Sequence, residues 1–174
     1  MIRLLFSIEM KKKLFRFERV SFSQKIIDMK ELIFSTNNDW AGLITRLTIG
    51  IVLFAHGSQK MLGWFGGGGF KRAMNYFTSN QHLPAIVGFL VICIEFFGSL
   101  CMIAGFASRL WAIAIIFLFL GIIFTASGRH GFFMNWYGTK QGEGYEFHLL
   151  MIGLAIATLI GGSGKYSIDI LLFN

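Results

Sequence analysis

The feature that most limits how this chain can fold is an apolar run, residues 84–105, with a single acid, Glu95, near its middle. A helix that crosses a bilayer needs about 20 mostly apolar residues, because its backbone polar groups must be satisfied within the segment. The run therefore predicts a membrane-spanning helix. A carboxylate in hydrocarbon costs roughly 2.5 to 3.5 kcal/mol, so we expect Glu95 to face a polar partner or a wet cavity.

Composition extends this prediction to the whole chain. Of its 174 residues, 55% are hydrophobic and only 14% are charged, which is far from an average soluble domain. Three more apolar segments, residues 41–62, 110–127 and 147–161, have the length or composition of spans. We expect an all-α, polytopic membrane protein, a four-transmembrane-helix bundle whose helices pack on one another inside the lipid.

The basic residues suggest how the chain is divided. Eight of the 16 Lys and Arg precede Trp40, so the net charge of +7 indicates a membrane-surface and topology signal and not a nucleic-acid-binding face. We divide the chain into a basic cytoplasmic tail, residues 1–40, and a transmembrane domain, residues 41–174. Residues 21–34 alternate apolar and charged side chains, consistent with an interfacial helix or a loosely ordered tail. Either Met1 or Met10 is a possible start.

Orientation follows from the distribution of Lys and Arg around the spans. With the N-terminus inside, ten basic residues flank the spans on the cytoplasmic side and four lie outside, which favours both termini in the cytoplasm. The two long loops, rich in glycine and aromatic residues, then face outward. Arg46 and Arg109 lie near the inner interface and are interpreted as topology anchors.

A polar site is predicted between the first two spans. His56 and Lys60 are four residues apart and share one face of the first helix. That helix runs outward and the second runs inward, and side chains lean toward the N-terminus of their own helix, so the two basic groups and Glu95 converge. Contact of Glu95 with His56 or Lys60 would form a proton-sharing or anion-handling pair. The alternative is a structural ion pair that only holds the helices together.

The loop before the fourth span is the second concentration of ionisable groups. Residues 127–148 contain His130, Glu143, Glu146 and His148 among aromatic residues. This loop could close over the Glu95 pair, although each of its residues alone is more typical of a solvated loop. The two cysteines, Cys93 and Cys101, form no C-x-x-C motif or Cys/His cluster, so the sequence lacks the ligands of a zinc or iron–sulfur site.

These motifs, in this order, resemble those of the DoxX family of small four-helix bacterial membrane proteins. The resemblance covers residues 41–172. Its segments are R-L-T-I-G-I-V-L-F-A-H-G-S-Q-K-M-L-G-W-F-G-G-G-G (46–69), E-F-F-G-S-L (95–100), G-F-A-S-R (105–109), G-F-F-M-N-W-Y-G (131–138), E-G-Y-E-F-H-L-L (143–150) and G-S-G-K-Y-S-I-D (162–169).

The resemblance implies a multi-pass protein of the bacterial inner membrane with a redox role. Members are similar to the membrane subunits of thiosulfate:quinone oxidoreductase, and others are linked to quinone or catechol detoxification and thiol-redox complexes. The resemblance thus implies a quinone-linked oxidoreductase subunit, with catalytic candidates Glu95, His56 and Lys60. The candidate cofactor-binding residues that the resemblance implies are His56, Lys60, Glu95, Trp136, Glu143, Tyr145 and Glu146. Arg46 and Arg109 are further positions of the family motifs.

Three classes of function remain open at this point. The protein could position a quinone while a partner in a redox complex supplies electrons. It could be a small-molecule or ion transporter with the Glu95 cluster as its midplane site, which would require a homo-oligomer. It could also be an accessory subunit whose polar residues hold helices together and dock a partner. A haem ligated by His56 with His130 or His148 is a weaker alternative.

Overall fold

The computed structural model describes residues 24, 25 and 27–173. The chain forms two compact units, Met1–Ile33 and Phe34–Asn174. In the first unit, residues 24, 25 and 27–33 are helical. Most of the predicted basic tail and the choice between Met1 and Met10 lie outside the described residues.

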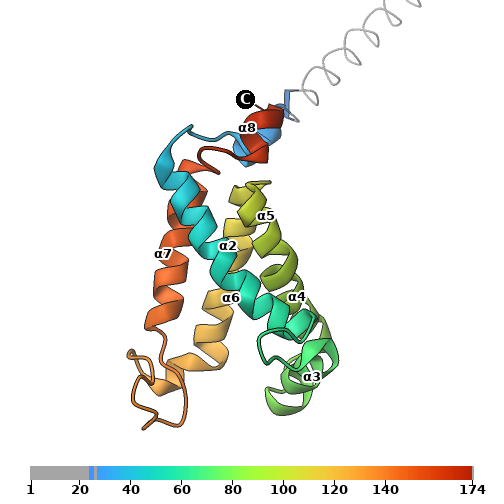
Figure 1. The fold of residues 1–174 in the computed structure, drawn as a ribbon, viewed down its shortest axis with the longest axis vertical. Helices are drawn as coiled ribbons and strands as arrows, with labels where there is room; N and C mark the ends of the chain where they lie inside the picture. The colour runs from blue at the N-terminus through green and yellow to red at the C-terminus, as the bar shows by residue number, and fades with distance from the viewer. Residues whose placement is uncertain (1–23, 26, 174) are drawn as a thin grey trace, which may run out of the picture. The chain divides into compact units, whose positions relative to one another are not determined.

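Every regular element in the described part of the chain is a helix, which confirms the all-α prediction. Among the described residues, three helices are long and apolar enough to cross a membrane: Trp40–Met61, Ala85–Ala104 and Ser108–Thr125. A fourth apolar helix, Glu146–Gly161, is shorter. Figure 1 labels these and the shorter helices of the second unit, which are α2 (Trp40–Met61), α3 (Gly69–Asn75), α4 (Ala85–Cys93), α5 (Ser99–Ala104), α6 (Ser108–Thr125), α7 (Glu146–Gly161) and α8 (Ile168–Phe173).

Two segments of π-helix interrupt the regular pattern within residues 27–173. The first, η1 (Tyr76–Asn80), follows α3, and the second, η2 (Ile94–Gly98), joins α4 to α5 within the predicted second span. A 3-10 turn, η3 (Ser127–His130), follows α6. The predicted spans and the observed long helices agree to within a few residues, because hydrophobic length alone determines such segments.

The helices begin and end at residues suited to those positions. The Asp39 carboxylate accepts a hydrogen bond from the Gly42 amide and caps the first turn of α2. Pro84 precedes α4, and Gly105, in the left-handed conformation with φ of 69°, ends α5. The chain then turns at once into α6.

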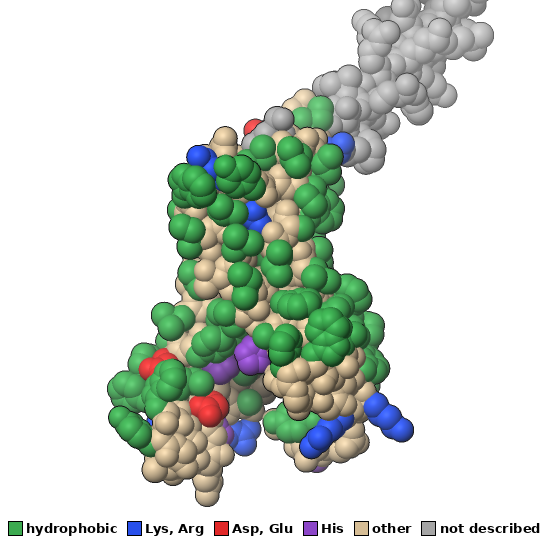
Figure 2. Space-filling model, viewed as in Figure 1, with side chains coloured by type: hydrophobic (Ala, Val, Ile, Leu, Met, Phe, Trp, Pro, Cys, Tyr) green, Lys and Arg blue, Asp and Glu red, His purple; other side chains and the backbone are tan. Residues whose placement is uncertain are grey.

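The bundle is apolar inside and outside. Its interior is a cluster in which residues of α2, α5, α6 and α7 meet, including Ile49, Met102, Ile115, Phe119 and Ala155. Many large hydrophobic side chains also point outward, among them Ile51, Phe124 and Ile160. Figure 2 shows hydrophobic side chains over the middle of the visible face and most charged side chains toward the ends. This distribution is that of helices solvated by lipid.

Glycines on α2 bring this helix against the second predicted span. A Cβ on Gly50 would lie 2.7 Å from the Ile103 side chain, and one on Gly57 would lie 2.5 Å from the carbonyl group of Glu95. Small residues at such crossings let helix backbones approach closely in a membrane. The close approach positions the C-terminal half of α2 next to η2.

Arg46 ties three segments together near the start of α2. Its side chain is 1% exposed and donates hydrogen bonds to five backbone carbonyls, those of Met102, Ile103, Ser163, Lys165 and Tyr166. The interpretation of Arg46 as an interfacial topology anchor is therefore wrong. The guanidinium can be buried because its fork of donors satisfies carbonyls in the last turn of α5 and in the segment between α7 and α8.

Asp169, in α8, has a matching role that the sequence did not reveal. Its carboxylate accepts hydrogen bonds from the amides of Ala107 and Ser108 and from the Ser163 hydroxyl. These amides belong to the start of α6, where free N–H groups favour an anion. The end of the bundle near α8 is thus held together by one buried cation and one buried anion.

Candidate functional site

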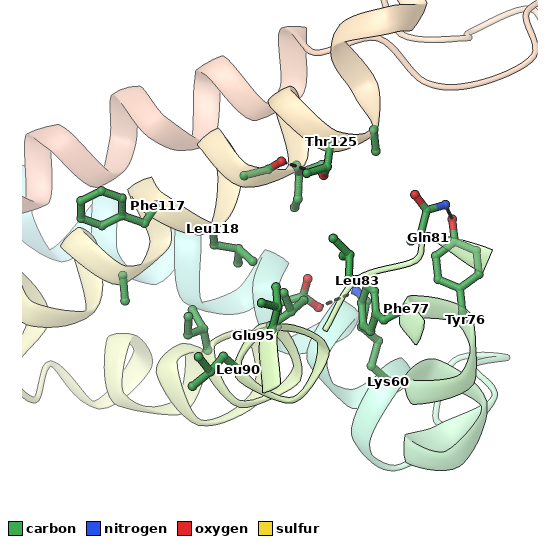
Figure 3. Close-up of a pocket in the computed structure, with 17 residues that line it drawn as sticks. Lys60, Tyr76, Phe77, Gln81, Leu83, Leu90, Glu95, Phe117, Leu118 and Thr125 are labelled. Carbon is green, nitrogen blue, oxygen red and sulfur yellow. Dashed lines mark hydrogen bonds and ion pairs between the residues drawn. The ribbon is translucent and has the colours of Figure 1, made fainter. Parts of the chain in front are cut away.

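A pocket of about 420 Å³ opens between the second predicted span and α6 (Figure 3). The segment from Tyr76 to Leu83 covers one end of it. Most of the lining is apolar and comes from α4, η2 and α6. The polar side chains in the lining are Lys60, Tyr76, Gln81, Glu95 and Thr125.

Lys60 and Glu95 form an ion pair in the wall of this pocket. The Lys60 Nζ lies 2.5 Å from Oε2 of Glu95, and the two side chains are 27% and 6% exposed. The sequence predicted contact of Glu95 with His56 or Lys60, and the structure confirms the contact with Lys60. Figure 3 shows the Glu95 carboxylate pointing into the pocket between the α4 and α6 ribbons.

The local fold explains why this pair can form. Gly57 is one helical turn before Lys60 on α2, and its missing side chain lets the helix rest on the Glu95 backbone. Glu95 itself lies in the π-helical turn η2. An extra residue in a helical turn changes the direction of the side chains around it, and such bulges are frequent at functional sites. A close crossing and a bulge together position the carboxylate.

Three polar residues of the pocket lining were not found by sequence reasoning. Tyr76 and Gln81, at the end that Figure 3 draws farthest from Phe117, are joined by a hydrogen bond of 2.9 Å from Gln81 Nε2 to the Tyr76 hydroxyl oxygen. Thr125, on α6, donates its hydroxyl to the Gly121 carbonyl. Nothing in the sequence distinguishes these residues from ordinary interfacial ones. The folding back of residues 76–83 over α4 brings Tyr76 and Gln81 to the pocket, and Thr125 reaches it from the end of α6.

His56 is close to the ion pair but does not line the pocket. It lies near enough to Lys60 and Glu95 to interact electrostatically with both, and its side chain is exposed. Within the described residues it has no hydrogen-bond partner. The structure therefore brings Lys60 and Glu95 together at the pocket and leaves His56 on the adjacent surface.

The loop before α7 does not close over the Lys60–Glu95 pair. Glu143 accepts from the Asn135 amide, and Glu146 accepts from the Met134 amide and from the Trp136 indole. These carboxylates are used to satisfy donors of their own loop. The predicted closure is therefore wrong for this structure.

The loop residues instead form a second, separate cavity. It has about 400 Å³ and is lined by residues that include Trp136, Glu146 and Phe147. Tyr145 packs edge-on against Phe132, and His130 lies against Gly142. The His148 ring packs on Phe119, with 5.5 Å between ring centroids. None of the candidate residues Trp136, Glu143, Tyr145 and Glu146 lines the Lys60–Glu95 pocket.

Fold and site together define a helical integral membrane protein with a partly buried ion pair in an apolar pocket between spans. The profile of the DoxX family matches residues 41–128, from the start of α2 to the end of α6, and the chain belongs to this family of small membrane proteins. The match includes both residues of the ion pair.

One curated relative extends beyond that region. The chain is 25% identical over 132 residues to "Putative oxidoreductase CatD" of Bacillus subtilis (strain 168), a match that covers 76% of this chain and 87% of that protein. No solved structure matches the chain.

Proposed function

We propose that this protein is a quinone-interacting component of a membrane oxidoreductase system and that the Lys60–Glu95 pocket is its site. The observation that carries the proposal is the ion pair itself, a cation and a carboxylate held in an apolar cavity among membrane helices. Placing an ionisable side chain inside a membrane-spanning helix costs free energy, and such side chains are associated with proton and substrate pathways. The name of the curated relative supports an oxidoreductase role.

The chemistry of the pocket fits a quinone headgroup. Ligand pockets combine an apolar lining with a few placed polar groups, commonly in a volume of about 300 to 1,000 Å³. Here the apolar walls suit a ring, the Lys60 ammonium can donate to a ring carbonyl, and Glu95 can hold a proton beside it. A bound quinone would supply two-electron, two-proton redox chemistry. In this proposal a partner protein supplies the electrons, and the chain's own residues orient the ring and handle protons.

The proposed topology has four spans, with both termini in the cytoplasm of a bacterium and the chain in its inner membrane. The sixteen residues of α7 extend about 24 Å, somewhat less than the roughly 30 Å of the hydrocarbon layer. Its packing along α6 and the contact of α2 with α7 support a transmembrane position. Slight thinning of the bilayer or interfacial residues at the helix ends can accommodate the shortfall.

The proposal is tested by quinone binding to the purified protein. We expect a soluble ubiquinone or menaquinone analogue to bind the wild type. It should bind Glu95→Gln at least about tenfold more weakly, because the carboxyl group that holds a proton beside the quinone ring is lost. The same isosteric change at an exposed acid of the tail, Glu31→Gln, is the matched control and should bind as the wild type does.

Other outcomes would contradict the proposal. If the wild type binds no quinone, or if Glu95→Gln binds it unchanged, the quinone role fails. Substrate flux in liposomes that Glu95→Gln abolishes without any redox partner would favour a transporter. Full activity and assembly in Glu95→Gln and Lys60→Met alike would favour an accessory subunit.

A further inference from the structure

The pocket is longer than a headgroup at the ion pair requires. Its lining on α6 runs from Ala114 to Thr125, which is about 16 Å along the helix axis. In Figure 3, Glu95 lies between the two ends, with Phe117 and Leu118 at one end and Tyr76 and Gln81 at the other. The end at Phe117 and Leu118 has only apolar side chains. A ring held at Lys60 and Glu95 would leave this part of the pocket unfilled.

This apolar part is open on the side that faces lipid. We call the line between Leu90 on α4 and Phe117 and Gly121 on α6 the lateral seam. Leu90 and Phe117 are 49% and 69% exposed although both line the pocket. A Cβ at Gly121 would meet no atom within 4 Å. The seam is therefore an opening through apolar side chains.

The packing of the helices leaves room for the pocket between α4 and α6. α6 packs against η2 and α5, whereas α4 is not among its main contacts. Figure 1 shows α4 and α6 diverging toward the end of the bundle that carries α3. Two spans that meet at one end and separate at the other leave a wedge open to the bilayer, and in this wedge lies the pocket.

Resting on the proposed function, we propose that the ligand enters from the bilayer through the lateral seam and is a long-chain quinone whose apolar tail lies in the seam. The ion pair holds the ring, while the tail runs over Leu90 and Phe117 into the lipid. The site then selects a membrane-dissolved, tailed quinone over a water-soluble quinone or catechol of the same headgroup. The separate cavity at Trp136 and Glu146 has no role in this selection.

Two benzoquinones with the same headgroup, one with a decyl chain and one without a chain, test the proposal by titration calorimetry of the full-length protein. Gly121→Leu places a large side chain in the seam, at a position where the structure has open space. We expect it to weaken binding of the decyl quinone about tenfold, since overfilling an apolar site is unfavourable, and to leave the chainless quinone unaffected. Gly121→Ala should have a smaller effect in the same direction.

Gly153→Leu is the matched control, because Gly153 on α7 also has open space around its Cβ and does not line the pocket. It should bind both quinones as the wild type does. If the wild type binds both compounds and Gly121→Leu weakens both equally or neither, the lateral-seam proposal is overturned while the quinone role stands. If the wild type binds neither compound, both proposals fail.

Discussion

Glu95 lies in apolar surroundings and forms an ion pair with Lys60, which makes the two residues energetically dependent on one another. Removing one partner of a buried ion pair costs about 3 to 5 kcal/mol, whereas replacing both with neutral side chains of similar size is often close to neutral. We therefore expect Lys60→Met to lower the free energy of unfolding by about 3 kcal/mol. The double variant Lys60→Met/Glu95→Gln should recover most of that loss.

Reversible unfolding in detergent micelles measures these differences. Lys71→Met, which removes an exposed lysine of α3, is the control and should change stability by no more than about 0.5 kcal/mol. If the stability losses of Lys60→Met and Glu95→Gln add up to the loss in the double variant, the two residues are not energetically coupled, which would contradict this account.

At the residue scale, the sequence predicted some contacts well and others not at all. The pairing of Glu95 with a base on the first span was predictable, because an acid in an apolar run needs a partner and helical spacing restricts the choice. The role of Arg46 was not, because its five acceptor carbonyls come from segments more than 50 residues away in the chain. Asp169 was missed for the same reason.

The crossing of α2 over η2 is the contact between elements on which the pocket depends. A methyl group on Gly57 would lie 2.5 Å from the Glu95 carbonyl carbon and oxygen, so Gly57→Ala must push the two helices apart. We expect a loss of about 1 to 3 kcal/mol in stability together with weakened quinone binding, since Lys60 and Glu95 separate. Thermal unfolding and the same binding titration measure both effects.

The control for the crossing is Gly153→Ala, where a new methyl group meets nothing within 4 Å. This substitution should be neutral or slightly stabilising, because alanine favours a helix more than glycine does. Unchanged stability and binding in Gly57→Ala would show that the crossing does not hold the pair in place.

At the element scale, the long helices were predictable and the irregular ones were not. Hydrophobic length gave α2, α6 and the second span to within a few residues. The π-helical turn η2 packs against α2, and no local pattern in residues 94–98 marks it. The short helix α8 is likewise stabilised by the buried contacts of Asp169, which are formed only in the folded bundle.

At the scale of the whole molecule, the number of spans decides on which side the two ends of the bundle lie. We first change Cys93 and Cys101 to serine and then introduce one cysteine at a time. The two variants are Ser79→Cys, in η1, and Tyr166→Cys, before α8. In intact cells we expect a membrane-impermeant maleimide to label the cysteine at position 79 only. The one at position 166 should react after the cells are lysed.

Two other labelling patterns would contradict this topology. If both positions react in intact cells, α7 does not cross the membrane and the chain has three spans. Labelling of position 166 alone would reverse the proposed orientation.

The central claim, that a quinone ring binds at Lys60 and Glu95, is tested most directly by photo-crosslinking in native membranes. A tailed benzoquinone with a photoreactive group is activated, and the modified peptides are mapped by mass spectrometry. We predict adducts within residues 76–95 and 114–126, and their loss in the folded double variant Lys60→Met/Glu95→Gln. Adducts confined to residues 131–150, or unchanged in the double variant, would contradict the claim.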